Sequence, residues 1–468
     1  MIYPPDTHFV RLAGPNQINL VQHFYAPPMG LLYLKSHLQQ KSGFQVLLWN
    51  AQVPSRPGLD KLEETINNFA PDLAGVSVNT ANWYDALECA KLVKKVRPGT
   101  HVVTGGVHMS VYPEETLAQP EVDSIVIGEG EDTLLEMATR LSQGGSLDGV
   151  AGAWFKKEGK VIRNPLRTVE KNPDRFPFPD RSELNLSQHR VSADRLSPAA
   201  VILTSRGCPF HCTFCCTVDK VYRRRSASEI VREALSCKEM GYKAIDFYDD
   251  IFNVKKKDVL ELCDELIRQK VNLPWICRCR VEPMDEEMVS KMREAGCERI
   301  QFGAESASQA ILDQIKKRIT PEQTRDAFRL AKKYGVSTLG YFMIGFPGET
   351  REQAEATVRF AFELDPEFAV FHSLIPVPGS EIYEQAAKSE AFYGDYVREF
   401  AQNPSPDFLF HSWETALSEA EQYRIIRKAN LGFYYRPRYI VRSLKKLSSF
   451  EDFVTKVKMA LRILSARA

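Results

Sequence analysis

Three regularly spaced cysteines carry the strongest chemical signal in the chain. The segment TSRGCPFHCTFCCT contains Cys208, Cys212 and Cys215 in the pattern C-x-x-x-C-x-x-C. Cysteine thiolates bind soft metals and hold iron–sulfur clusters. A 4Fe-4S cluster bound by only three thiolates leaves one iron open to a substrate or cofactor, as the open position of a catalytic zinc does. Structural zinc is the alternative, with His211 or Cys216 as the fourth ligand.

The composition fits a globular protein with more than one domain. The 468 residues are 44% hydrophobic and 26% charged, and the net charge is +1. This length suggests about two or three domains, and the small net charge gives no reason to expect a nucleic acid partner. No apolar run reaches the roughly 18–20 residues of a membrane span, and MIYPPDTHF lacks the features of a signal peptide. We therefore expect a cytoplasmic protein, in which clustered cysteines bind metal or do chemistry more often than they form disulfides.

Short apolar runs alternate with amphipathic stretches up to about Leu141. The runs that predict strands are Gln45–Trp49, Leu73–Val78, His101–Thr104 and Ser124–Ile127. The stretches that predict helices are Gly30–Gln40, Leu59–Asn68, Ala86–Lys95 and Glu131–Leu141. Strands separated by helices predict an α/β fold with a doubly wound, Rossmann-like parallel sheet. Met1–Tyr3 reads as the stub of a first strand, which is either very short or continues upstream of Met1.

A second alternating region follows from about Ala199. Its expected strands are Ala199–Thr204, Ala244–Tyr248, Trp275–Cys279, Arg299–Phe302, Thr338–Ile344 and Ala369–Ile375. Its expected helices are Ala227–Met240, Lys257–Lys270, Glu286–Ala295, Gln309–Ile315, Pro321–Tyr334 and Arg351–Leu364. Six strand–helix steps predict a partial (βα)6 barrel, with a second Rossmann-like sheet as the alternative.

These patterns divide the chain into four parts. The first domain is expected at residues 1–143, an irregular connector at 144–198, the barrel at 199–383 and a helical C-terminal region at 384–468. The last region contains FYYRPRYIVRSLKKL and a final helix, FEDFVTKVKMALRILSARA. This basic amphipathic end either caps the barrel or lies on a membrane surface.

The cysteine loop resembles the signature of the radical S-adenosylmethionine (SAM) superfamily, with the aromatic Phe214 before the last cysteine. The resemblance covers about Pro198–Tyr383. It includes FYDD, RCRVEPM, IQFGAES, GYFMIGFPGET and IPVPGSEIY. Each motif falls at or just after the end of an expected strand. A parallel barrel places all these strand ends on one face, where the active sites of such barrels form.

The resemblance implies a cluster that reductively cleaves SAM to a 5′-deoxyadenosyl radical, fed by an electron donor such as flavodoxin or ferredoxin. It implies Cys208, Cys212 and Cys215 as the metal ligands, with the backbone at Phe214 close to the adenine. The GFPGE turn is expected to shape the adenine wall.

Four charged residues on the same face are further candidates. The resemblance favours Glu305 as a contact to the ribose or amine of SAM and Arg280 as a contact to its carboxylate. The alternative is a buried Glu305–Arg280 pair with a structural role. Asp249 and Asp250 are the candidate catalytic residues, either as substrate ligands or as simple helix N-caps.

The first sheet resembles the B12-binding domain found at the front of many radical SAM proteins. The motifs are DLAGVSVNTANW, VVTGGVHMSVYPEETL and VDSIVIGEGEDTLLEM. Each lies at the carboxyl end of an expected strand, where glycine lets the backbone approach a ligand closely. The expected cobalamin contacts are Ser77, Asn79, Thr80, Gly105, Gly106, Glu129 and Gly130.

The first strand departs from this family pattern. Many B12 domains have D-x-H-x-x-G there, with the histidine ligating cobalt. Here DTHFVR gives Asp6 and His8, but Arg11 stands where glycine is expected. His8 is therefore a candidate cobalt ligand, and the alternative is cobalamin bound without a protein histidine.

The leading hypothesis is a cobalamin-dependent radical SAM enzyme that methylates an unactivated carbon of a small-molecule or lipid-like metabolite. One SAM would supply the methyl group through methylcobalamin, and a second would make the radical. One alternative is radical cyclisation, ring contraction or oxidation without methyl transfer. Another is a non-catalytic iron–sulfur or corrinoid-binding protein. We expect no nucleic acid partner and no membrane span, while the C-terminal region leaves peripheral membrane contact open.

Overall fold

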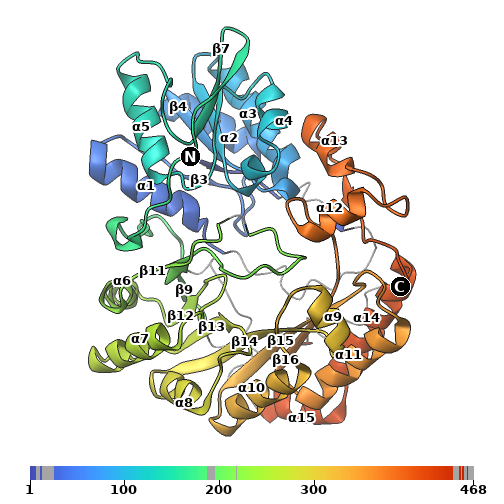
Figure 1. The fold of residues 1–468 in the computed structure, drawn as a ribbon. Coiled ribbons are helices and arrows are strands. Elements are labelled where there is room, and N and C mark those ends of the chain that lie inside the picture. Colours follow the sequence, from blue (N-terminus) through green and yellow to red (C-terminus); the bar gives the residue numbers. More distant parts are fainter. Residues whose placement is uncertain are drawn as a thin grey trace. The chain divides into compact units, whose positions relative to one another are not determined.

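The computed structural model describes most of the chain. The described residues are 1–6, 11–12, 26–186, 196–217, 219–445, 453–454, 456–457 and 461. His8 and most of the predicted final helix lie outside them. The chain forms two compact units (Figure 1). Unit 1 contains Met1–Arg11, Pro27–Gln188 and Asp395–Leu409, and unit 2 contains Leu12–Ala26, His189–Gly394 and Phe410–Ala468.

A seven-stranded sheet forms the centre of unit 1, in the order β3-β1-β4-β5-β6-β7-β8. Its parallel strands are β1 (Ile2–Tyr3), β3 (Trp49–Asn50), β4 (Leu73–Ser77), β5 (His101–Gly105) and β6 (Ser124–Val126). The helices of this region are α1 (Met29–Ser42), α2 (Leu59–Phe69), α3 (Trp83–Val96), α4 (Pro113–Ala118) and α5 (Glu131–Ser142), with 3₁₀ turns η1 (Thr80–Asn82) and η2 (Val107–Ser110).

This strand order confirms the predicted doubly wound sheet. Counted along the chain, the parallel strands follow the flavodoxin-like order 2-1-3-4-5. In such sheets the ligand binds beyond the carboxyl ends of the strands where the winding direction reverses. Here that switch point lies between β1 and β4, which pair in parallel at Ile2 and Val76.

The region after α5, predicted as an irregular connector, contains a hairpin. Strands β7 (Ala153–Lys157) and β8 (Lys160–Arg163) add antiparallel to β6 and complete the sheet. The turn between them is Glu158–Gly159, with φ of 52° and 74°. A two-residue turn with positive φ at both positions matches the twist of a hairpin. A short 3₁₀ turn, η3 (Pro173–Arg175), follows.

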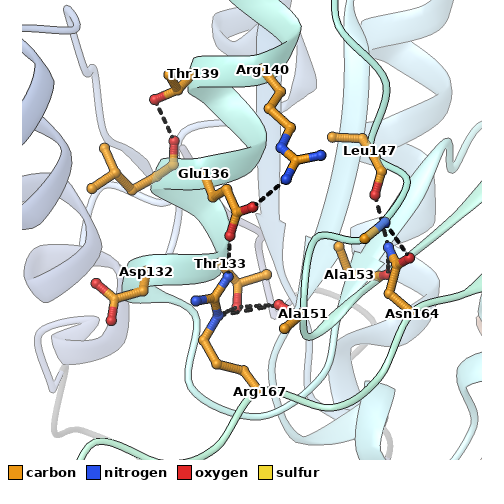
Figure 2. A network of polar contacts seen from close by, with 12 residues as sticks. Asp132, Thr133, Glu136, Thr139, Arg140, Leu147, Ala151, Ala153, Asn164 and Arg167 are labelled. Carbon is orange, nitrogen blue, oxygen red and sulfur yellow. Dashed lines mark hydrogen bonds and ion pairs between the residues drawn. The ribbon is translucent and has the colours of Figure 1, made fainter.

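Polar side chains fasten this hairpin region to α5, as Figure 2 shows. The Arg167 guanidinium donates to Glu136 of α5 at 2.5 Å. The Asn164 side chain donates to the carbonyls of Leu147 and Ala153, both at 2.8 Å. Buried backbone carbonyls need such partners, so the hairpin region is an integral part of unit 1.

Unit 2 contains a six-stranded parallel sheet in the order β16-β15-β14-β13-β12-β9. Its strands are β9 (Ala199–Ile202), β12 (Ala244–Phe247), β13 (Trp275–Cys279), β14 (Cys297–Glu305), β15 (Ser337–Ile344) and β16 (Phe368–Ser373). Its helices are α6 (Ala227–Glu239), α7 (Lys256–Arg268), α8 (Glu286–Glu294), α9 (Gln309–Gln314), α10 (Pro321–Lys333) and α11 (Arg351–Leu364). Neighbours in sequence are neighbours in the sheet. This order confirms the partial barrel, and the alternative of a second Rossmann-like sheet is wrong.

The two faces of this sheet differ in burial. Along β15, Phe342 and Ile344 are fully buried in an apolar cluster with residues of α11 and α14 (Glu419–Tyr434). Tyr341 and Met343 point to the other face and are half-buried. Successive residues of a strand point to opposite faces of its sheet. We call the face that carries Tyr341 and Met343, opposite the face covered by α11 and α14, the inner face of the barrel sheet.

The C-terminal region serves both units. Helix α12 is Glu381–Ala387, α13 is Tyr396–Gln402, α15 is Pro437–Lys445, and the two-residue strands β2 and β17 are Arg11–Leu12 and Leu409–Phe410. Helix α13 belongs to unit 1, where the Trp83 indole donates to the Ala401 carbonyl at 3.0 Å. Helix α14 packs on the barrel sheet, and the Tyr434 hydroxyl donates to the Ala369 carbonyl of β16 at 2.7 Å. No helix in the described part of the chain combines the length and apolar character that a bilayer crossing requires.

Candidate functional site

The cysteine loop follows β9, and a short antiparallel ladder closes its base. Strands β10 (Ser205–Arg206) and β11 (Arg223–Arg224) pair on either side of the loop. Gly207 has a φ of +77°, and a Cβ there would lie 2.4 Å from the Val221 carbonyl oxygen. Only glycine fits this close backbone approach. The base of the loop is therefore fixed immediately before Cys208.

The three predicted cluster cysteines are free thiols in this loop. Cys208 is buried, Cys212 and Cys215 are half-buried, and the extra Cys216 is exposed. The Cys215 amide donates to the Cys212 carbonyl at 3.1 Å, which turns the chain between these two cysteines. Burial raises the pKa of the Cys208 thiol, and repulsion from Asp250 and the other two thiols adds to the effect. The three cysteines are therefore close enough to influence one another electrostatically.

The three thiols are soft ligands of the type that an iron–sulfur cluster uses. Among the residues that the structure describes, no three Cys, His, Asp or Glu side chains gather as ligands of one metal ion. A structural zinc needs four ligands at about 2.0–2.3 Å from one point. Each thiolate of a 4Fe-4S cluster binds a different iron, so its ligands stand apart. Three free cysteines in one loop are compatible with such ligands.

Asp249 holds the strand that leads into the cysteine loop. Its Oδ1 accepts from the Thr204 and Ser205 amides at 2.8 and 2.6 Å and from the Ser205 hydroxyl at 2.8 Å. Its Oδ2 accepts from the Thr204 hydroxyl at 2.8 Å. Burial raises the pKa of Asp249, while Arg224 and these donors oppose the rise. Asp249 is 2% exposed and its oxygens are occupied, so it positions the loop.

The neighbouring Asp250 is exposed and lies close enough to act electrostatically on Cys208. Helix α7 begins at Lys256 after the N-cap residue Lys255. The alternative that Asp249 or Asp250 caps this helix is therefore wrong.

Arg280 lies against the cysteine loop, just after β13. Its guanidinium stacks on the Phe210 ring at 4.0 Å and approaches the Cys212 sulfur at 3.9 Å. It also pairs with Glu282 at 2.7 Å and donates to the Lys317 carbonyl. A cation this close to the thiols can hold an anionic group beside the cluster.

Glu305 ends β14 with a φ of +60° and is 5% exposed. Its partner is Lys317, at 2.7 Å between Oε1 and Nζ. The alternative of a direct Glu305–Arg280 pair is therefore wrong. A Cβ on Gly303 would lie 2.5 Å from the Glu305 carboxylate and 2.8 Å from the Lys317 ammonium, so glycine makes the room for the pair. The sequence analysis missed Lys317, which lies in no recognised motif.

Aromatic groups and a buried carboxyl line the next strand end. The Phe214 ring meets Phe346 edge-on at 6.3 Å between centroids. Glu349, at the end of the GFPGE turn, accepts from the Gly345 amide at 2.6 Å and from the Phe346 amide at 3.3 Å. Burial raises the pKa of Glu349 to about 7, against these two hydrogen bonds. The carboxyl shapes the turn from within.

The inner face of the barrel sheet carries polar side chains. Arg278 pairs with the fully buried Asp246 at 2.6 Å and lies 3.7 Å over the Tyr248 ring. The Tyr341 hydroxyl donates to the Gln301 amide oxygen at 2.6 Å. The half-buried His372 of β16 is a further polar group of this face. Barrel interiors are usually filled by branched apolar residues, so this face is chemically specialised.

The predicted cobalamin residues gather at strand ends in unit 1. Ser77 ends β4 and is in register with Gly105, which ends β5. Asn79 and Asn82 form a reciprocal capping box, so the Asn79 side-chain oxygen is used within η1. Thr80 follows at the first position of η1 and is half-buried. Ser77, Thr80 and Gly105 thus lie together beside the switch point.

The glycines at these strand ends are required to different degrees by the surrounding structure. Gly106 has a φ of +116°, and its Cβ would lie 2.3 Å from the Val78 carbonyl. Any side chain there collides with the neighbouring strand, whatever ligand is present. A Cβ on Gly105 meets nothing nearer than Val126, at 3.9 Å. Gly130 caps α5 and lies against Leu34, while Glu129 before it is half-buried.

Two families match the chain. The Radical SAM superfamily matches residues 202–361, which include the cysteine loop and most of the barrel sheet. The B12 binding domain matches residues 18–138, which include the glycine-bearing strand ends of unit 1.

The relatives include a methyltransferase and a cyclase. A protein named as an uncharacterised methyltransferase from Pyrococcus horikoshii is 34% identical over 441 residues, covering 93% of this chain and 93% of that protein. The anaerobic magnesium-protoporphyrin IX monomethyl ester cyclase of Rubrivivax gelatinosus is 29% identical over 379 residues, covering 78% of this chain and 67% of the cyclase.

A solved structure shares the whole fold. The radical S-adenosylmethionine methyltransferase TsrM from Kitasatospora setae, solved with cobalamin and a [4Fe-4S] cluster bound, matches with a TM-score of 0.74. The match covers 100% of this chain and 99% of that chain at 21% sequence identity. At this identity the likeness shows the fold.

Proposed function

The chain belongs to the radical SAM superfamily as a cobalamin-dependent radical SAM enzyme, and we propose that it methylates an unactivated carbon of a small-molecule metabolite. The observation that carries the proposal is the set of three free thiols with the Arg280 guanidinium against them. The named relatives support methyl transfer as the reaction.

The geometry of unit 2 supports a set of proposed cofactor ligands. Cys208, Cys212 and Cys215 would hold the cluster. Arg280, stacked on Phe210 beside Cys212, would bind the carboxylate of SAM. Arginine suits this task because its guanidinium is always charged and presents donors in a fixed fork. When bound, the cluster and SAM would supply the radical that removes a substrate hydrogen, and cobalamin would supply the methyl group.

Glu305 and Lys317 would hold the sugar or amine end of SAM. Their ion pair is buried, with side chains 7% and 8% exposed. The Lys317 ammonium also lies 5.8 Å from the centre of the Phe214 ring. A charged pair held in one geometry under an aromatic ring can direct hydrogen bonds to a hydroxyl or ammonium group. Phe214 and Phe346 would keep water from this end of the site.

The inner face of the barrel sheet favours a substrate with polar groups. Arg278, Tyr341 and His372 offer donors and acceptors there, and Tyr248 beside them is 45% exposed. Asp246 and Gln301 use part of the capacity of Arg278 and Tyr341, and a hydrocarbon would offer no partner to the donors and acceptors that remain, at a cost in binding free energy. We therefore place a ring or chain that carries hydrogen-bonding groups ahead of a lipid-like metabolite.

Radical cyclisation is the second candidate, because the magnesium-protoporphyrin ester cyclase is also a relative. One experiment separates the two. The full chain is reconstituted anaerobically with iron, sulfide and hydroxocobalamin, then incubated with SAM and a reductant or with flavodoxin or ferredoxin as the one-electron donor. Methyl transfer predicts S-adenosylhomocysteine that depends on cobalamin, together with 5′-deoxyadenosine. Formation of 5′-deoxyadenosine alone supports the cyclase-type reaction, and formation of neither overturns the enzyme proposal.

A further inference from the structure

A buried histidine beside the predicted cobalamin residues has one unsatisfied nitrogen. His108 follows Gly106 in η2 and is completely buried. Its Nδ1 lies 3.1 Å from the Thr80 hydroxyl oxygen, and its Nε2 has no hydrogen-bond partner among the described residues. Burial lowers the pKa of His108 to about 3, so the ring is neutral at physiological pH. One of its nitrogens therefore carries a proton and the other does not.

The unsatisfied nitrogen decides which of the two tautomers is favoured. If Nε2 carried the proton, a buried N–H would have no acceptor, and orphaned N–H groups are rarer in proteins than orphaned acceptors. The favoured tautomer carries the proton on Nδ1 and donates it to Thr80. The Thr80 oxygen then acts as an acceptor toward His108, and its own proton is directed elsewhere.

The packing around the ring keeps this geometry fixed. The His108 ring lies between Trp83, at 5.1 Å, and Tyr112, at 5.4 Å between centroids. Trp83 is itself anchored by its hydrogen bond to the Ala401 carbonyl of α13. The ring therefore cannot turn to exchange its two nitrogens without displacing both neighbours.

Thr80 lies where a ligand of this sheet is expected, just beyond β4 at the switch point. The adjacent Asn79 oxygen is used in the capping box, whereas the one side-chain contact of the Thr80 hydroxyl among the described residues is that with His108. We propose that His108 is a positioning residue that commits the Thr80 hydroxyl to donate a hydrogen bond to a phosphate or amide oxygen in the nucleotide tail of cobalamin. The inference rests on the proposed function, because it requires that unit 1 binds the cofactor.

A double-mutant cycle tests this assignment. The full chain with its cluster reconstituted is titrated with hydroxocobalamin, and the dissociation constant is followed by visible absorbance. The variants are Thr80→Val, His108→Phe and the double variant, because valine and phenylalanine keep the shapes and remove the polar atoms. We expect Thr80→Val to weaken binding about two- to tenfold, the range of one hydrogen bond. The double variant should bind as weakly as Thr80→Val alone, since His108 acts only through Thr80.

Two amide variants distinguish positioning from simple packing. The His108→Asn amide can place an N–H near the position of Nδ1, so binding should recover toward the wild-type constant. The longer His108→Gln side chain reaches toward Nε2 and should not restore binding. Thermal unfolding and iron content show whether each variant is folded and keeps its cluster. If His108→Phe does not fold, the comparison of the cobalamin affinities of His108→Asn and His108→Gln tests the positioning role.

The failure of this inference is distinct from that of the proposed function. Wild-type protein that binds no hydroxocobalamin overturns both. Wild-type binding with an unchanged constant for Thr80→Val overturns the inference alone. Losses that multiply in the double variant show that His108 acts independently of Thr80, which also overturns it.

Discussion

Replacing Asp249 by alanine is expected to remove the iron–sulfur cluster although Asp249 is not one of the proposed ligands. The substitution leaves the buried Thr204 and Ser205 amides without the acceptor that they share. An unsatisfied buried donor costs about 1–3 kcal/mol, so the two amides together cost about 2–6 kcal/mol. The two hydroxyls can rotate to other acceptors. This cost falls on the segment that enters the cysteine loop, and total stabilities are only about 5–15 kcal/mol.

Asparagine at the same position is the matched control. Its side-chain oxygen can keep the three hydrogen bonds that Oδ1 accepts, two of them from backbone amides. Its NH₂ group takes the place of Oδ2 opposite the Thr204 hydroxyl, which can accept as well as donate. We expect a loss of about 1 kcal/mol or less and an intact loop. Asp250→Ala, at the exposed neighbour, controls for the loss of a carboxylate near the thiols.

The assay is iron and sulfide per chain after anaerobic reconstitution, with visible absorbance and thermal unfolding of the same samples. The expected order is wild type, Asp249→Asn and Asp250→Ala with full clusters, and Asp249→Ala with little or none. Full iron in Asp249→Ala refutes the positioning role. Asp249→Asn is expected to keep full iron and to be only slightly less stable. If this variant keeps full iron but loses turnover, the charge of Asp249 takes part in the reaction.

Five further substitutions give distinct expected outcomes. Cys216→Ala should keep the cluster, and loss of iron would indicate a fourth thiolate ligand. Glu305→Gln should weaken SAM binding about ten- to a hundredfold in equilibrium dialysis at unchanged iron content, because a charge-assisted contact is removed. Gly105→Ala should fold normally but lose cobalamin, whereas Gly106→Ala should lower the unfolding temperature even without cofactor, because its Cβ meets the neighbouring strand. The pKa of Glu349 is about 7 in the folded chain and 4.5 in the unfolded chain. The contribution of this carboxyl to stability is therefore fully present below pH 4.5 and is lost as the pH rises to about 7. Glu349→Gln should remove this fall in the thermal stability.

The barrel sheet could be predicted from the sequence because each of its strands and helices has a clear hydrophobic pattern of its own. The run at Thr338–Ile344 and the helix after it at Arg351–Leu364 agree with β15 and α11 to within one residue. Buried parallel strands are continuous apolar runs, and the helices between them carry one apolar face. The cysteine loop was equally clear, because its three regularly spaced cysteines lie within eight residues of one another.

The hairpin of unit 1 was missed because its turn carries a weak signal. Glu158 adopts a φ of 52°. Asparagine, aspartate or glycine in a sequence predicts this left-handed conformation, and glutamate does not. Helix α13 lies in the region predicted as helical, but its place in unit 1 was missed for a different reason. Its Arg398 pairs with Glu115 at 2.8 Å, across 283 residues of sequence. Local periodicity contains no information on such a contact, so only the folded chain shows that this helix completes unit 1.

Position on the functional face does not by itself separate ligand-binding residues from supporting ones. Asp249 and Asn79 stand at strand ends as a ligand contact would, yet other protein groups occupy their oxygens. Glycine is required at position 106 whether or not a cofactor is bound, because a Cβ there would collide with the Val78 carbonyl after β4. Unused hydrogen-bonding capacity is the more selective criterion, because a buried polar group without a partner is costly and persists where a ligand or water completes it. By this criterion, Thr80 with His108 behind it is the strongest candidate for a cofactor contact in unit 1.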